Sequence, residues 1–173
     1  LHVIRDYNLT EIFSHINPAM LYTRHLGYRG RFQERLQEGD RKAVELRQQV
    51  KAVEDLMLAR PDIMAHGVYK FFRAASDKCD VVVLSASGNE EIERFQFGRQ
   101  GNAEGLCLAD YLQPVDSGVP DYVGMFVTSI GPGIRDLAEN WKSEGQFLKS
   151  IILQVLALEG AEGFAELLHE HMR

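Results

Sequence analysis

The sequence has few of the residues that define several specialised protein classes. It contains two cysteines, five prolines and one tryptophan among 173 residues. Cys79 and Cys107 lie far apart and form no Cys-x-x-Cys motif, which excludes a disulfide scaffold and a metal site of that type. Free thiols in a reducing compartment are the simpler interpretation, and they predict a cytoplasmic protein. No apolar run approaches the roughly 20 residues of a membrane-spanning helix, so we expect no membrane insertion.

Basic residues are also too few for a general nucleic-acid-binding protein. The chain has 19 Lys and Arg against 25 Asp and Glu, which gives a net charge of −6, whereas binding to a phosphate backbone needs an excess of cations. The local exception is the segment 24–35, which contains Arg24, Arg29, Arg31 and Arg35. Two interpretations remain open: a solvated helix face and loop, or a docking patch for an acidic partner.

Generic catalytic motifs are missing as well. The sequence contains no Gly-x-Ser-x-Gly elbow, phosphate-binding loop or His-Glu-x-x-His motif. Gly131-Pro132-Gly133 resembles a phosphate loop only superficially, because Pro132 lacks an amide donor, and we expect a turn there. His169 and His171 lie two apart on a predicted helix, so they point to different faces and cannot hold one metal. The sequence therefore predicts no catalytic residue and no metal site, and it does not support a self-contained hydrolase or transferase.

Helical periodicity covers both ends of the chain. Apolar spacing and capping residues predict helices over residues 8–16, 18–26, 40–59, 134–142 and 147–172. Pro18 biases the preceding residue away from the helical region, which separates the first two helices. Asp40 is the expected cap of the third helix. In the last helix, we expect one apolar stripe of Phe147, Ile151, Val155 and Leu158, which is widened by Ile152, Leu156, Phe164, Leu167 and Leu168.

The middle of the chain changes to β-type sequence. Short β-branched and aromatic runs predict an antiparallel meander over residues 63–74, 81–84 and 92–97. The run 121–130 is the most apolar, so we expect it to be the most buried strand. No repeat or linker divides the chain. We therefore predict a single domain over residues 1–173, of the α+β class, with an antiparallel sheet flanked by helices and a long C-terminal helix.

Two glycines interrupt the last predicted helix. Gly160 and Gly163 share one face and each costs about 1 kcal/mol relative to alanine. They can serve close packing, a ligand groove or a kink, and the sequence leaves these three open. Glu162 between them is either a solvated charge or a carboxylate at the floor of a groove that receives a cationic group. Asp110 and Asp116 flank a turn, where aspartate usually caps the backbone.

Five blocks of sequence stand out in order along nearly the whole chain. They are residues 12–22, 67–74 with 79–84, 97–100 with 107–111, 117–126, and 161–173. Together they resemble the activation domain of cobalamin-dependent methionine synthase. The resemblance implies a bent antiparallel sheet flanked by helices, with a shallow groove that binds S-adenosylmethionine. It also implies a partner domain that carries cobalamin, and an electron donor of the flavodoxin or diflavin-reductase type.

The same resemblance implies particular site residues. Asn17 matches a family position where Asp or Asn contacts the amino-acid end of the methyl donor, and Glu162 matches a family Glu near the same ligand. Glu159 stands where some family members carry Arg. The family's main donor-binding motif, Arg-x-x-x-Gly-Tyr, would follow the closing helix, beyond Arg173. We therefore expect either a truncated domain or a divergent relative that has lost direct donor binding.

The expected function follows from this resemblance. An accessory domain would bind S-adenosylmethionine and support the reductive methylation of cob(II)alamin, which reactivates the synthase. The alternative is an interaction module in corrinoid-protein repair that does not itself bind the methyl donor. In either case, an acidic electron donor can use the basic segment 24–35 as a docking patch.

Overall fold

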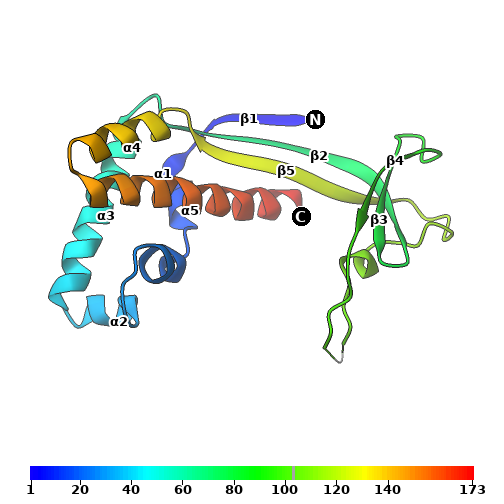
Figure 1. Ribbon diagram of the computed structural model, residues 1–173. Coiled ribbons are helices and arrows are strands. Elements are labelled where there is room, and N and C mark those ends of the chain that lie inside the picture. Colours follow the sequence, from blue (N-terminus) through cyan, green and yellow to red (C-terminus); the bar gives the residue numbers. More distant parts are fainter. Residues whose placement is uncertain (103) are drawn as a thin grey trace. The chain divides into compact units, whose positions relative to one another are not determined.

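The computed structural model describes residues 1–102 and 104–173. Its elements in chain order are β1 (His2–Tyr7), α1 (Leu9–Ser14), η1 (Ala19–His25), α2 (Phe32–Gln37), α3 (Arg41–Ala59), β2 (Met64–Asp77), β3 (Asp80–Leu84), β4 (Glu91–Gln96), η2 (Leu108–Tyr111), β5 (Asp121–Gly131), α4 (Ile134–Ser143) and α5 (Phe147–Met172) (Figure 1). The strands form one sheet in the order β1-β2-β3-β4, and β5 also pairs with β2. The predicted α+β class, with helices around a sheet and a long C-terminal helix, is confirmed.

The chain divides into two compact units. We call Leu1–His2 with Tyr69–Phe126 the strand unit, and Val3–Val68 with Val127–Arg173 the helical unit. The strands β2 and β5 contribute residues to both. None of the helices in the described residues combines the length and apolarity that a membrane crossing requires.

Local sequence signals account for most element boundaries. The Asn8 side chain accepts a hydrogen bond of 2.9 Å from the Thr10 amide at the start of α1, and Asp40 accepts one of 2.9 Å from the Ala43 amide at the start of α3. Gly145, with φ of 79°, separates α4 from α5. The helix over 147–172 begins and ends where the sequence predicts. The apolar periodicity of the short elements β1 and α2 is weak, so the sequence does not predict them.

The predicted meander is present in the strand unit. β2 pairs with β3 and β3 with β4, both antiparallel, and Asp77 pairs with Asp80 across a two-residue turn. Ala74 and Val81 form a small buried cluster with Cys107 and Ala109 from the segment around η2.

The prediction that β5 is the most buried strand is wrong. None of its residues is fully buried, and Tyr122 and Val127 are 58% and 67% exposed. The buried strand is instead β3, through its central valines. An apolar run indicates that a strand can be buried. Whether it is buried depends on whether a second layer of the structure covers its faces.

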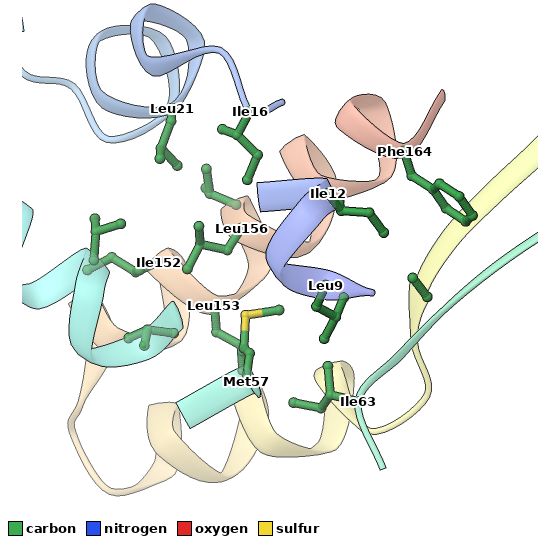
Figure 2. Close-up of a cluster of buried hydrophobic side chains, with 14 of the residues drawn as sticks. Leu9, Ile12, Ile16, Leu21, Met57, Ile63, Ile152, Leu153, Leu156 and Phe164 are labelled. Carbon is green, nitrogen blue, oxygen red and sulfur yellow. The ribbon is translucent and has the colours of Figure 1, made fainter. Parts of the chain in front are cut away.

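The helical unit has its core where α1, α3 and α5 meet. Figure 2 shows the side chains that fill it, among them Ile12, Met57, Ile152, Leu153, Leu156 and Phe164, all fully buried. Burying a side chain of this size contributes about 1.5–3 kcal/mol, so this cluster holds the three helices together.

The apolar stripe predicted for α5 is buried only in part. Val155 and the residues expected to widen the stripe, such as Ile152 and Leu156, are buried, whereas Phe147, Ile151 and Leu158 are each about half exposed. The first half of α5 is apolar on nearly all sides, so its periodicity does not indicate which side meets the core.

Candidate functional site

The glycines of α5 let α1 approach it closely. A Cβ atom at Gly163 would lie 3.0 Å from the carbonyl oxygen of Ile12 and 3.4 Å from the Cβ of His15. A Cβ atom at Gly160 would collide with Cδ1 of Ile130 from β5. Close packing is therefore the role of both glycines, among the three that the sequence left open, and α5 continues through them as one helix.

The same turn of α5 is also tied to β5. The Thr128 hydroxyl donates a hydrogen bond of 2.9 Å to the carbonyl oxygen of Ala161. Because Gly160 and Gly163 face inward and Ala161 is bonded to β5, the backbone around Glu162 is held on two sides. The Glu162 side chain points outward and is exposed. It has no hydrogen-bond or ion-pair partner among the described residues.

Asn17 lies between α1 and η1. Its Oδ1 accepts hydrogen bonds from the amides of Ala19 at 2.9 Å and Met20 at 3.4 Å, so the side chain caps η1. Asn17 is exposed and follows His15, the residue that contacts Gly163, by two positions. No hydrogen bond or ion pair of the described chain joins Asn17 to Glu162, and their shared role at a ligand stays a prediction.

A groove of about 610 Å³ opens beside Asn17. Its walls come from the residues after Asn17 and from the start of α2: Pro18, Ala19, Met20, Thr23, Arg24, Gly30, Arg31, Phe32, Gln33 and Glu34. Arg31 pairs with Glu34 at 2.8 Å, and Arg35 pairs with Glu38 at 3.0 Å. Arg24 and Arg29 are exposed and make no ion pair within residues 1–102 and 104–173. The basic segment thus combines two neutralised and two uncompensated guanidinium groups beside a groove.

Comparison with known proteins identifies the fold. A family model described as vitamin B12 dependent methionine synthase, activation domain, matches residues 8–173. The chain belongs to this family. A solved structure described as the MetH reactivation domain bound to AdoHcy is similar, with a TM-score of 0.82 and 25% sequence identity over 98% of this chain. The match covers 55% of that structure's chain, so the chain spans about half its length. The resemblance inferred from the five blocks is confirmed.

Glu159, the position where the resemblance implied an Arg in some family members, is a buried carboxylate here. It is 2% exposed, and its Oε1 lies 2.8 Å from Nε2 of His25 in η1. The two atoms are close, but their geometry does not make a hydrogen bond, and Oε1 has no hydrogen-bond partner among the described residues. This contact connects η1 to α5. Sequence reasoning missed it because the two residues are far apart in the chain.

The turn Gly131-Pro132-Gly133 leads into α4, as expected. Gly133 adopts φ of 90°, and a Cβ atom there would lie 3.1 Å from Oδ2 of Asp62. The Asp62 carboxylate pairs with Arg60, which lowers the pKa of Asp62. An acidic side chain at this helix start disfavours a phosphate at the same place, so the activation domain uses the loop as a turn.

Asp110 is a structural residue in this activation domain. Its carboxylate accepts two hydrogen bonds from Arg99, at 2.7 and 2.8 Å, and one of 3.0 Å from the Cys107 amide. These contacts, with Arg99 first, hold the pKa of Asp110 below its usual range. The expected capping role of Asp110 is confirmed. The sequence did not indicate that Arg99 is its bidentate partner.

Proposed function

We propose that this chain binds S-adenosylmethionine and supports the reductive methylation of cob(II)alamin, which reactivates cobalamin-dependent methionine synthase. The observation that carries the proposal is the likeness of 98% of the chain to a reactivation domain bound to AdoHcy. AdoHcy is the molecule that remains when S-adenosylmethionine has given up its methyl group. Membership of the activation-domain family over residues 8–173 supports the same function. The alternative, an interaction module that does not bind the methyl donor, is not favoured by these findings.

We assign the amino-acid end of the donor to Glu162 and Asn17. Glu162 is an exposed carboxylate on a stretch of α5 held by Ile12 and Thr128, so it can accept hydrogen bonds from an ammonium group without distorting the helix. The Asn17 amide nitrogen makes no hydrogen bond to a described residue, whereas its oxygen caps η1. An amide donor and a carboxylate together would suit a ligand that carries both an ammonium and a carboxylate group.

The proposed methyl transfer depends more on how the methyl donor is positioned than on reactive side chains of this chain. A methyl group on a positively charged sulfur is already a strong electrophile, and the reduced cobalt of cobalamin, carried on a partner domain, is a strong nucleophile. The contribution of this chain is therefore to hold and orient the donor. This accounts for a family domain whose sequence contains no generic catalytic motif.

Two partners belong to the proposal. One is the cobalamin-binding domain, which must meet the donor face to receive the methyl group. The other is an acidic, flavodoxin-like or diflavin electron donor, for which the basic segment 24–35 offers Arg24 and Arg29. Complementary charge of this kind raises association rates and orients the encounter. A cytoplasmic location agrees with these partners.

Calorimetry with S-adenosylmethionine tests the proposed function. Wild-type protein should release or absorb heat on titration, and Glu162→Gln should weaken binding by roughly 10–100-fold, because a hydrogen bond to a charged group contributes about 1.5–3 kcal/mol. Glu166→Gln is the matched control, since Glu166 is an exposed carboxylate one turn further along α5. It should bind the donor like wild type.

Asn17 needs a pair of variants because it also caps η1. Asn17→Ala removes the cap and the amide, whereas Asn17→Ser keeps a capping oxygen and removes only the amide. Loss of affinity in both variants, with unchanged circular dichroism for Asn17→Ser, supports a direct contact. A wild-type chain that gives no binding signal overturns the proposed function, and unchanged affinity in a variant removes that residue from the site.

A further inference from the structure

The two cysteines meet in the strand unit although they lie 28 positions apart. The Cys107 thiol donates a hydrogen bond to the backbone carbonyl of Cys79, with Sγ 3.5 Å from the oxygen. Both side chains belong to the small apolar cluster around Ala74 and Val81. Disulfide-bonded cysteines have Cβ atoms about 3.5–4.5 Å apart, and the hydrogen bond places the Cys107 sulfur against the backbone of Cys79.

Independent contacts hold the backbone of each cysteine. Cys79 lies in the two-residue turn between β2 and β3, and its carbonyl also accepts a hydrogen bond of 3.2 Å from the Phe97 amide. Cys107 precedes η2, where its amide is bound by Asp110, and Asp110 is clamped by Arg99. The backbones of the two cysteines are therefore held in place by separate sets of contacts.

The two cysteines differ in access to solvent. Cys107 is only 3% exposed, whereas Cys79 is half-buried.

We propose that Cys79 and Cys107 form a reversible intramolecular disulfide when the protein meets a low-molecular-weight disulfide. The sulfur of Cys79 attacks the oxidant, its S–S bond breaks, and one thiol molecule leaves. The sulfur of Cys107 then attacks the Cys79 sulfur of the mixed disulfide and releases the second thiol molecule. The protein loses two electrons and two protons, and the oxidant is reduced to two thiols. Cytosolic disulfides are usually transient sensors of this kind.

The bond would add a covalent link between two parts of the strand unit that hydrogen bonds already join, such as those between the backbone of Ser76 and that of Gln113 and Val115. It closes a loop that contains β3 and β4 and fixes the segment of η2 to the β2–β3 turn. The inference goes beyond the proposed function, since it requires neither methyl donor nor cobalamin, and each can fail without the other.

Treatment with oxidised glutathione, followed by alkylation, proteolysis and mass spectrometry, tests the disulfide. Wild type should give a linked pair of peptides that contain Cys79 and Cys107, with the loss of two hydrogen atoms, and dithiothreitol should reverse it. Oxidation should also lower the alkylation rate of Cys107 in urea by more than roughly tenfold, because the linked sulfur no longer reacts.

The single variants identify the order of events. Cys107→Ser should stop at a mixed disulfide with glutathione on Cys79, and Cys79→Ser should leave the buried Cys107 unmodified under native conditions. Circular dichroism checks that each variant folds. A wild-type product that is only the mixed disulfide on Cys79, a disulfide-linked dimer, or an unmodified chain overturns the proposal.

Discussion

Gly163 determines how closely α1 can pack on α5. The atom that a Cβ would meet there is the Ile12 carbonyl oxygen at 3.0 Å, which belongs to the backbone and cannot rotate away. At Gly160 the obstructing atom is Cδ1 of Ile130, the end of a flexible side chain. The two glycines lie on one face of α5, but they therefore differ in how well they tolerate a larger side chain.

Alanine substitutions should reveal this difference. Overpacking at Gly163→Ala costs about 1–3 kcal/mol, and the better helix propensity of alanine offsets about 1 kcal/mol of it. We expect a net loss of up to about 2 kcal/mol in the free energy of unfolding, measured by urea denaturation. Gly160→Ala is the matched control and should lie within about 1 kcal/mol of wild type. Equal losses in the two variants would contradict the argument.

The buried carboxylate of Glu159 is the second residue whose surroundings matter. His25→Ala leaves the buried carboxyl group of Glu159 without its neighbour, and a buried polar group without a partner costs about 2 kcal/mol or more. The loss should appear in urea denaturation. The double variant His25→Ala with Glu159→Leu should recover part of the stability, because no buried carboxyl group remains. A single His25→Ala variant as stable as wild type would show that the contact contributes nothing.

At the scale of elements, α3 depends on its cap. The Asp40 carboxylate accepts hydrogen bonds from the Ala43 amide and, at 3.0 Å, from the Tyr28 hydroxyl. These two contacts, the amide first, hold the pKa of Asp40 below its ordinary value of 3.8. The unfolded chain therefore binds this proton more readily than the folded one, and the stabilisation is present above pH 3.8 and is lost as the pH falls through the folded pKa.

Acid titration of stability tests the cap. Asp40→Asn keeps a capping oxygen but does not titrate, so its free energy of unfolding should fall less steeply than that of wild type below pH 3.8. Urea denaturation at a series of pH values measures both slopes. Asp55→Asn is a suitable control, since Asp55 lies within α3 and does not cap it. Identical slopes for Asp40→Asn and wild type would show that the Asp40 cap does not contribute to the loss of stability in acid.

At the scale of the whole molecule, the net charge of −6 makes the basic segment 24–35 an exception. If a flavodoxin docks there, the double variant Arg24→Ala with Arg29→Ala should bind it roughly tenfold more weakly at low salt, and the difference should shrink as salt screens the charges. Fluorescence titration measures the affinity. Arg41→Ala is the control, because Arg41 is exposed and paired with Glu45. Equal weakening by the control would indicate a general charge effect.

Much of the fold could be predicted from local sequence. Asn8 and Asp40 cap helices by bonding amides two or three residues away, Pro18 separates α1 from η1, and the turn at Lys78 joins β2 to β3. Each of these signals acts over a few residues, so neighbouring sequence contains all the information needed. The five blocks identified the family for the same reason. Each block is a short run of neighbouring residues, and their order follows the chain.

The sequence by itself determined which segments become helices or strands and the family to which they belong. The tertiary structure alone decided which face of α5 meets the core, that β5 stays half exposed, and that His25 meets Glu159 and Cys79 meets Cys107. Periodicity describes the faces of one element but contains no information about the distant element that covers them. Burial and long-range pairing depend on how separate elements pack, and that arrangement exists only in the folded chain.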